Sequence, residues 1–199
     1  HGERRAGFMA MLTINDIKNG DFIVIDGAPY QVLSVKHLHI GRGGSSVQTK
    51  IKNVKTGQVF ERNYKPSDSF GEADLLKFKV QFVYAHRGEY WFMEPGKPQS
   101  RFSLKEDTIG EAKNFLKKDL EAVALKWNDQ IINIELPIKV DYVVVDAPPA
   151  VRGDTAQGGT KQVSIENGYK VLTPLFIEAG DVIRLNTETG EYVERVSKA

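Results

Sequence analysis

Short strand-like segments separated by turn dipeptides run through almost the whole chain. Each segment is rich in β-branched and aromatic residues and often alternates apolar with polar positions, which is typical of half-buried β-strands. Turn pairs such as Asp26-Gly27, Arg87-Gly88 and Asn167-Gly168 stand between the segments. The clearest segments cover residues 22–26, 30–35, 46–54, 59–64, 79–85, 89–94, 131–136, 140–146, 171–177 and 181–185. This pattern predicts an all-β fold of closely spaced hairpins.

Two stretches interrupt the strand pattern with helical spacing. A short helix is predicted from about residue 107 to 116, with Ile109 and Phe115 on its apolar side, and we expect it to seal one end of a barrel. A weaker helix is predicted over residues 14–19, where it would stop at Gly20.

The chain divides into three expected modules after a short first segment. Residues 1–10 have no apolar core of a signal sequence, and we interpret them as a tag or processing remnant. Polar and turn residues near 66–69 and a proline at position 137 suggest modules of 11–74, 75–136 and 137–199. Small SH3-like or OB barrels fit these lengths, and OB folds commonly bind nucleic acid. No exact internal repeat is visible.

Composition excludes several classes of protein. Of the 199 residues 41% are hydrophobic, but no stretch approaches the roughly 18 consecutive apolar residues of a membrane helix. The chain has no cysteine, so disulfides and thiolate zinc sites are excluded. Its formal net charge is only +1, yet residues 36–65 carry seven lysines and arginines against the single acid Glu61. Such a local excess of positive charge favours a nucleic-acid partner.

Motifs of catalytic sites are missing. His37 and His39 would share one face of a strand and provide two metal ligands, but no further ligands accompany them, so a basic, RNA-facing strand is the favoured interpretation. The GRGG segment is not followed by Gly-Lys-Ser/Thr or by a helix, so it is not a phosphate-binding P-loop. We therefore expect neither catalysis by the chain's own side chains nor a cofactor or metal.

A lone arginine stands in the glycine-rich segment between two predicted strands. Arg42 is flanked by Gly41, Gly43 and Gly44 in the sequence IGRGGSS. Glycines permit positive φ angles and a close approach of the backbone to another molecule. The segment therefore predicts a hairpin tip that can reach with one long cationic side chain into a narrow space.

Three stretches, in this order along the chain, resemble the bacterial elongation factor P family. The first is GRGGSSVQTKIKNVKTGQVFER, from residue 41 to 62; the second is VRGDTA, from 151 to 156; the third is GYKVLTPLFI, from 168 to 177, with the following GDVI and TGEY. The resemblance covers the chain from Met11 onward. Many members of the family have Pro-Gly-Lys-Gly at the tip. Here Ile40 replaces the proline and Arg42 replaces the lysine, which gives the arginine-tip, GRGG form.

The resemblance implies a fold and a function. The fold is a KOW/SH3-like barrel followed by two OB barrels in an L-shaped arrangement that mimics tRNA. The function is that of a monomeric translation factor, not an enzyme, which binds the 70S ribosome between the P and E sites. There it acts beside the peptidyl-tRNA and promotes peptide bond formation at polyproline stalls. The resemblance also implies a cytoplasmic or organellar location without a membrane partner.

The same resemblance assigns roles to individual residues. Arg42 falls at the position that reaches the CCA end of the P-site tRNA and is a candidate for modification by a separate enzyme. Lysylation is excluded there, whereas rhamnosylation, another modification or a bare side chain stay open. The D-arm of the tRNA is read by a loop, and RNA phosphates are contacted by three cations. The loop is Gly153, Asp154 and Thr155, and the cations are Lys50, Lys52 and Arg152.

Two alternatives remain at this point. Aromatic residues of the central module, Phe78, Phe82, Tyr84, Tyr90, Trp91 and Phe92, could form a platform for stacked bases, but alternation along paired strands favours core packing. The whole chain could also be a paralogous ribosome-binding factor, or a general OB-fold RNA-binding protein without a role at proline stalls.

Overall fold

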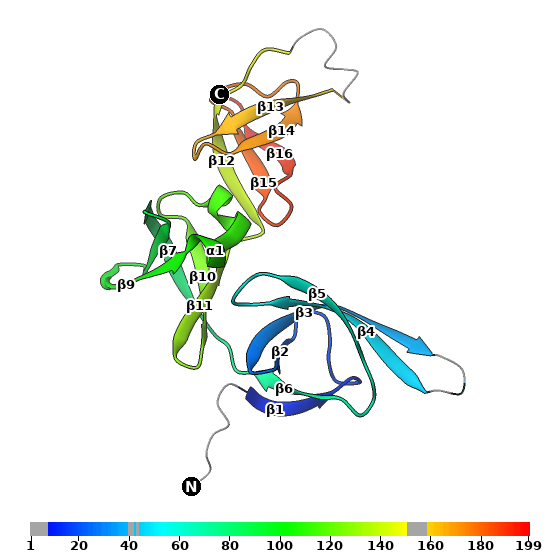
Figure 1. Ribbon diagram of the computed structural model, residues 1–199. Coiled ribbons are helices and arrows are strands. Elements are labelled where there is room, and N and C mark those ends of the chain that lie inside the picture. The colour runs from blue at the N-terminus through cyan, green and yellow to red at the C-terminus, as the bar shows by residue number, and fades with distance from the viewer. Residues whose placement is uncertain (1–7, 40–41, 43, 151–158) are drawn as a thin grey trace. The chain divides into compact units, whose positions relative to one another are not determined.

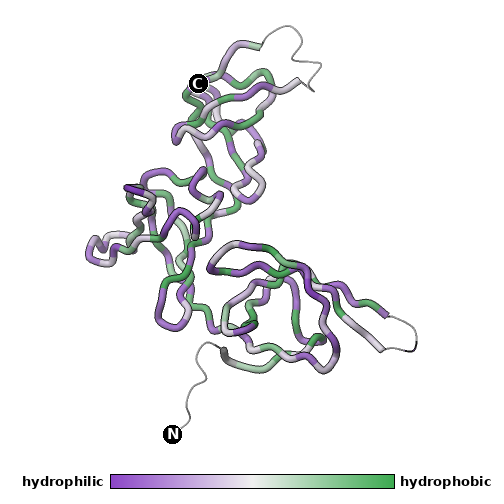
Figure 2. Tube along the Cα trace, viewed as in Figure 1, coloured by the Kyte–Doolittle hydropathy of each residue, from purple (hydrophilic) through white to green (hydrophobic). Residues whose placement is uncertain are grey.

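The all-β prediction is confirmed. The computed structural model describes residues 8–39, 42, 44–150 and 159–199, and these form sixteen strands in three sheets (Figure 1). Hydrophobic and hydrophilic residues alternate along many strands, so that one side of each sheet is available for a core (Figure 2).

The first sheet has six strands in the order β1-β6-β2-β3-β4-β5. Its core consists of Ile14, Ile17, Ile23, Val32, Val47 and Phe70, all almost fully buried. The strands are β1 (Phe8–Thr13), β2 (Phe22–Ile25), β3 (Ala28–His39), β4 (Ser45–Asn53), β5 (Val59–Tyr64) and β6 (Ser69–Ala73). Neighbouring strands are antiparallel throughout, and short connections join β2 to β3, β3 to β4 and β4 to β5 as hairpins.

The second and third sheets have five strands each. The second, in the order β11-β10-β7-β8-β9, consists of β7 (Leu76–His86), β8 (Glu89–Glu94), β9 (Lys97–Lys105), β10 (Glu121–Trp127) and β11 (Gln130–Glu135). The third, in the order β14-β13-β12-β15-β16, consists of β12 (Lys139–Asp146), β13 (Thr160–Ile165), β14 (Lys170–Pro174), β15 (Val182–Asn186) and β16 (Tyr192–Ser197).

The chain clusters into two compact units. One contains the residues up to Lys79 together with Leu104–Ile109 and Val123–Ile134. The other contains Val80–Ser103, Gly110–Ala122 and Glu135–Ala199. Within the first unit, Val54 packs with Leu125, Trp127 and Ile132, and the Asn133 side-chain amide donates to the Val54 carbonyl at 2.7 Å.

The helix predicted near residue 107 is present but short. It forms α1 (Glu106–Ile109) and continues as a 3₁₀ segment (Gly110–Phe115). Gly110 has φ of 59°, a left-handed conformation that commonly ends an α-helix, so the α-helical hydrogen bonding stops after one turn. Ile109 and Phe115 are buried, as expected. Within the described ranges no helix is long and apolar enough to cross a bilayer.

The helix predicted over residues 14–19 is wrong, because two turns replace it. The Asp16 carboxylate accepts hydrogen bonds from the backbone N–H and the hydroxyl of Thr13, at 2.8 and 2.9 Å, and these bonds lower the pKa of Asp16. Lys18 donates in the same way to Asp21 at 2.8 Å. Side-chain carboxylates thus compete for backbone donors that a helix would need.

A structural repeat links the first and third sheets, although the sequence showed no exact repeat. Both contain Ile-x-x-Gly-Asp, with Gly20 at φ of 92° and Gly180 at φ of 91°. Each glycine donates to a valine carbonyl, that of Val32 or Val144, at 2.7 and 2.8 Å. A second shared turn, Asn-x-x-Thr-Gly, begins at positions 53 and 186, and in each case the asparagine side chain accepts two backbone N–H groups.

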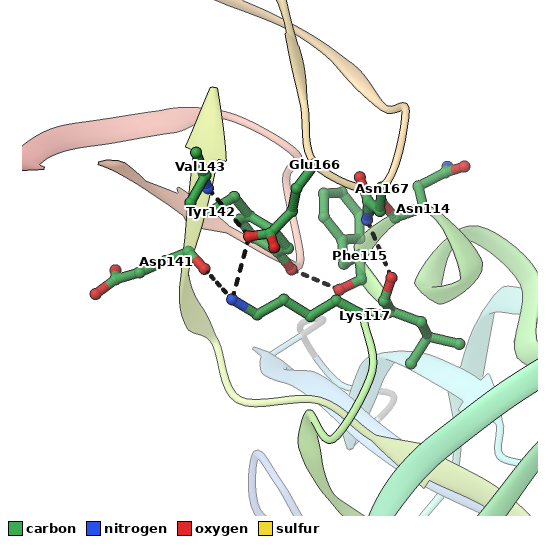
Figure 3. A network of polar contacts seen from close by, with 9 residues as sticks. Asn114, Phe115, Lys117, Asp141, Tyr142, Val143, Glu166 and Asn167 are labelled. Atoms are coloured by element: carbon green, nitrogen blue, oxygen red, sulfur yellow. Dashed lines mark hydrogen bonds and ion pairs between the residues drawn. The ribbon is translucent and has the colours of Figure 1, made fainter. Parts of the chain in front are cut away.

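Phe115, at the end of the 3₁₀ segment, belongs to the core of the third sheet. This core contains Val140, Tyr142, Val144, Val163, Ile165, Val171, Ile177, Ile183 and Leu185. The Tyr142 hydroxyl donates to the Phe115 carbonyl at 2.6 Å, as Figure 3 shows. Burial, and then the charge of Glu166, raise the pKa of Tyr142 above its ordinary value. The segment before β10 therefore completes the C-terminal barrel-like core.

Polar contacts reinforce this junction (Figure 3). The Lys117 ammonium donates to the Asp141 carbonyl at 2.5 Å and lies 3.4 Å from the Glu166 carboxylate. The same carboxylate accepts the Val143 N–H at 3.0 Å. Asn167 donates to two carbonyls at the end of the 3₁₀ segment, those of Asn114 and Leu116, at 2.7 and 3.1 Å. These bonds satisfy backbone acceptors that the short helix leaves free.

We expect Tyr142→Phe to destabilise this junction by about 1–3 kcal/mol, because the buried Phe115 carbonyl loses the hydroxyl that it accepts from. Amide hydrogen exchange of residues 110–117 and of β12 measures the loss locally. Tyr84→Phe is the matched control, since it removes the hydroxyl from an exposed ring. Equal protection in the two variants would show that the bond contributes nothing.

Candidate nucleic-acid interface

The β3–β4 hairpin extends beyond the end of β5, the strand that pairs with β4 on its other side. Strand β5 ends at Tyr64, which pairs with Val47 of β4. Past that point β3 and β4 pair only with each other, through Leu38 with Ser46 and His39 with Ser45 (Figure 1). The hairpin therefore projects from the body of the six-stranded sheet, as a tip that reaches a partner must.

Arg42 lies at the end of this hairpin and is exposed. Gly44 follows with φ of 86°, a backbone conformation that residues other than glycine rarely adopt. Apart from its neighbours in the chain, no atom of the described residues lies within 4 Å of the Cβ position that it lacks. The open space there agrees with the predicted slender tip. Gly41 and Gly43, the other two glycines of the prediction, lie outside the described residues.

Lys50 and Lys52 are brought together on one face of β4. Both are exposed, whereas Val47, Thr49 and Ile51 point to the opposite face and are buried. The Thr49 hydroxyl is satisfied by the Arg62 carbonyl at 2.9 Å.

A third cation joins this face from the neighbouring strand. Lys36 pairs with Gln48, which alternation places on the same side as Lys50 and Lys52. We call Lys36, Lys50 and Lys52 the hairpin basic face. Glu61 pairs directly with Lys50 and is the acid nearest to this face in the register.

Other cations of the basic region point elsewhere. Arg62 lies on the opposite face of the hairpin, with its guanidinium 5.6 Å from the Phe60 ring. The Lys55 ammonium lies 5.2 Å from the ring of the buried Trp127. Counting charges along the sequence therefore overestimates the number of cations on one surface. Strand alternation and packing divide the seven cations of residues 36–65 among several surfaces.

His37 and His39 share one face of β3, on the side opposite Lys36. Among the residues that the structure describes, no group of three or more histidine, cysteine or acidic side chains is arranged to hold a metal ion. His37 and His39 therefore have no third ligand beside them among the described residues.

The predicted D-arm loop joins β12 to β13, but Arg152, Gly153, Asp154 and Thr155 lie outside the described residues. The strands on either side are described and are paired, with Val144 opposite Ile165 and Asp146 opposite Ser164. Gly159, after the loop, has φ of 72°.

The central aromatic residues divide between two faces of the sheet. Phe82 and Phe92 are 8% and 0% exposed, so core packing is confirmed for them. Tyr84 is 43% exposed and stacks on Trp91, with ring centroids 6.2 Å apart and an angle of 14° between the ring planes. The core interpretation is wrong for Tyr84, because a β-bulge between Phe82 and Tyr84 shifts the register and turns Tyr84 outward.

Three family models match successive parts of the chain. Residues 13–70 match the elongation factor P KOW-like domain, residues 75–134 the elongation factor P OB domain, and residues 140–195 the elongation factor P C-terminal domain. Among solved structures, the chain resembles eukaryotic translation initiation factor 5A from Methanococcus jannaschii. That match has a TM-score of 0.48 at 15% identity over 63% of this chain and 93% of that one.

Full-length relatives show the same relationship. The chain is 37% identical to elongation factor P of Symbiobacterium thermophilum, 38% identical to that of Moorella thermoacetica and 40% identical to that of Thermotoga petrophila. Each match spans 185 residues, which is 93% of this chain and 100% of the relative. The chain belongs to the elongation factor P family.

Proposed function

We propose that this protein is a translation elongation factor that binds the 70S ribosome between the P and E sites and promotes peptide bond formation at polyproline stalls. The observation that carries the proposal is the projecting β3–β4 hairpin, with exposed Arg42 at its end and exposed Lys50 and Lys52 along one face. This hairpin occurs in a chain whose three parts all match elongation factor P domains.

The proposed action needs no chemical group on this chain. Proline's ring restricts φ, which makes it a poor partner for the reaction. Holding the CCA end of the P-site tRNA in a productive geometry lowers the barrier through orientation and entropy, and such effects are worth several kcal/mol. A single extended guanidinium on a slender tip suits this task, because it adds hydrogen bonds to RNA with little bulk. In this proposal the ribosome remains the catalyst and the factor is not an enzyme.

Further parts of the proposal concern partners and sites. The loop from Arg152 to Thr155 contacts the D-arm of the P-site tRNA, and a separate enzyme can modify Arg42. The protein acts as a monomer in the cytoplasm or in an organelle. The modules end near residues 74 and 136, and their L-shaped arrangement stays a prediction.

Ribosome profiling of a strain that lacks the protein tests the function directly. We expect pauses at consecutive proline codons that disappear when the wild-type chain is restored. Unchanged ribosome occupancy at those codons would overturn the proposal and favour a general RNA-binding role. Tighter binding to 70S ribosomes than to free RNA separates the same two alternatives.

The hairpin basic face provides a second test. We expect the double substitution Lys50→Glu and Lys52→Glu to weaken binding to 70S ribosomes and to reduce the slope of log affinity against log salt by about one for each lysine, because each neutralises one phosphate. Lys170→Glu, at an exposed lysine of β14, is the charge-matched control. An unchanged salt slope in the double variant would remove these lysines from the interface.

A further inference from the structure

Two large aromatic side chains lie side by side on the outer face of the second sheet. Tyr84 of β7 pairs directly with Trp91 of β8, and the two rings are nearly parallel. Tyr84 is 43% exposed and Trp91 is partly exposed. Part of this stacked tyrosine–tryptophan pair is therefore accessible to a partner from solvent.

Other aromatic rings form the core on the inner face of this sheet. On its inner face the Phe82 and Phe92 rings lie 5.5 Å apart, and the Phe92 and Phe102 rings are stacked at 5.6 Å with 18° between their planes. Exposing aromatic surface forgoes roughly 25 cal/mol for each Å² that burial would remove from water. A pair of rings left on the solvent side is therefore a candidate contact surface for a partner with a flat apolar face.

The neighbouring strand supplies a positive charge to the same face. The Phe102 side chain of β9 points into the core, so alternation places the exposed Arg101 on the outer side, next to β8. Arg87, also exposed, lies in the β7–β8 turn three residues beyond Tyr84.

Polar and acidic groups on this face are few. Gln81 pairs with Met93 next to the aromatic pair, and the described carboxylate that shares the outer side of β7 and β8 is Glu89, opposite His86 at the hairpin end. Arg101 thus lies on the outer side of the strand next to β8, whereas Arg87 and Glu89 lie at the turn end of the β7–β8 hairpin. This charge distribution favours a polyanion with flat bases over an acidic or purely apolar protein surface.

We propose that Tyr84 and Trp91 form a stacking site for an unpaired nucleobase of RNA, with Arg101 contacting the adjoining phosphate. Strands two and three of an OB fold form its usual oligonucleotide-binding face, and β8 and β9 hold these places in the central sheet. Every base has a π-face, so the site takes bases with little sequence preference. The inference rests on the proposed function for the source of this RNA, which is ribosomal RNA.

Binding of a fluorescently labelled single-stranded oligouridylate of about eight nucleotides, a length within the site sizes of OB folds, measures the stacking. We expect Tyr84→Ala and Trp91→Ala to weaken binding by the full chain about tenfold or more, whereas Tyr84→Phe and Trp91→Phe keep most of the affinity because they keep a ring. Arg101→Ala is expected to lower the salt slope by about one.

Phe176→Ala is the matched control, since it removes another exposed aromatic ring, 55% exposed, from the turn that follows β14. It is expected to leave binding unchanged. Unchanged affinity in both alanine variants, or equal loss in Phe176→Ala, would overturn the stacking site. Because Tyr84 is exposed, its variants are expected to fold, and thermal unfolding checks this.

Ultraviolet crosslinking on 70S ribosomes identifies the source. Crosslinks from Tyr84 or Trp91 to ribosomal RNA support the proposal, whereas crosslinks to a ribosomal protein, to tRNA or to mRNA overturn it. Relief of proline stalls is measured separately with the same variants. A wild-type chain that relieves stalls without these crosslinks contradicts only the stacking site, and one that crosslinks without relieving stalls contradicts only the proposed function.

Discussion

Replacing Arg42 with alanine is expected to reduce relief of polyproline stalls to the level seen without the factor. The hairpin tip carries Arg42 past the end of β5, and the flanking glycines offer no other long side chain. Because the proposed action is positioning, loss of the one positioning group removes an effect on the order of 100-fold in rate. Synthesis of a peptide with consecutive prolines in a reconstituted translation system measures the result.

The stability of the protein is expected to stay within about 0.5 kcal/mol of wild type, because an exposed residue at a hairpin end makes few contacts. Lys170→Ala is the matched control, since it removes an exposed cation of β14 that lies outside the hairpin. Full activity of Arg42→Ala would refute the assigned role of the tip. Mass spectrometry of the native protein shows whether Arg42 carries a modification that alanine also removes.

Asp181→Ala is expected to cost roughly 3 kcal/mol in the stability of the C-terminal sheet. The Asp181 side chain is 1% exposed and accepts backbone N–H groups from Glu178 at 2.9 Å and from Ala199 at 2.8 Å. The Arg195 guanidinium lies 3.8 Å from the Asp181 carboxylate. Hydrogen bonds to a charged acceptor contribute about 1.5–3 kcal/mol each, and removing the acceptor leaves buried donors without a partner.

Asp21→Ala is the internal control for this substitution. Asp21 occupies the same Ile-x-x-Gly-Asp turn in the first sheet, but it is only partly buried and accepts one backbone N–H, from Lys18. Its loss is expected to cost about 1 kcal/mol. Hydrogen exchange of the two turns separates the local effects. Equal losses in the two variants would mean that burial of Asp181 adds nothing.

Asp181 also predicts a dependence of stability on pH. Burial would raise the pKa of Asp181, but the two backbone hydrogen bonds and the charge of Arg195 outweigh it and lower the pKa below the ordinary 3.8. The stabilisation is therefore fully present above that value and is lost as the pH falls through the lowered pKa. The difference in stability between wild type and Asp181→Asn is expected to stay constant at neutral pH and to shrink only in strong acid.

Much of the fold could be predicted from the sequence, because period-two alternation and turn pairs are local signals. The strands at 22–26, 89–94 and 140–146 and the exposed tip at Arg42 were found in this way. The prediction of a helix over residues 14–19 was wrong, because the Asp16 and Asp21 carboxylates accept hydrogen bonds from backbone N–H groups and so favour turns there. The basic region was found, but the separate surfaces of Lys55 and Arg62 depend on pairing and packing.

The sequence by itself determined the local geometry of this protein, since a Gly-Asp pair or a Thr-Gly turn contains the atoms that close it. The turns at Gly20 and Gly180 have almost the same φ for this reason. Only the tertiary structure decided that Asp181 is buried beside Ala199 while Asp21 is not. Only the tertiary structure placed Tyr84 and Trp91 together outside the core. A single bulge reverses the side of a strand, and its position depends on the partner strand rather than on the residues within one segment.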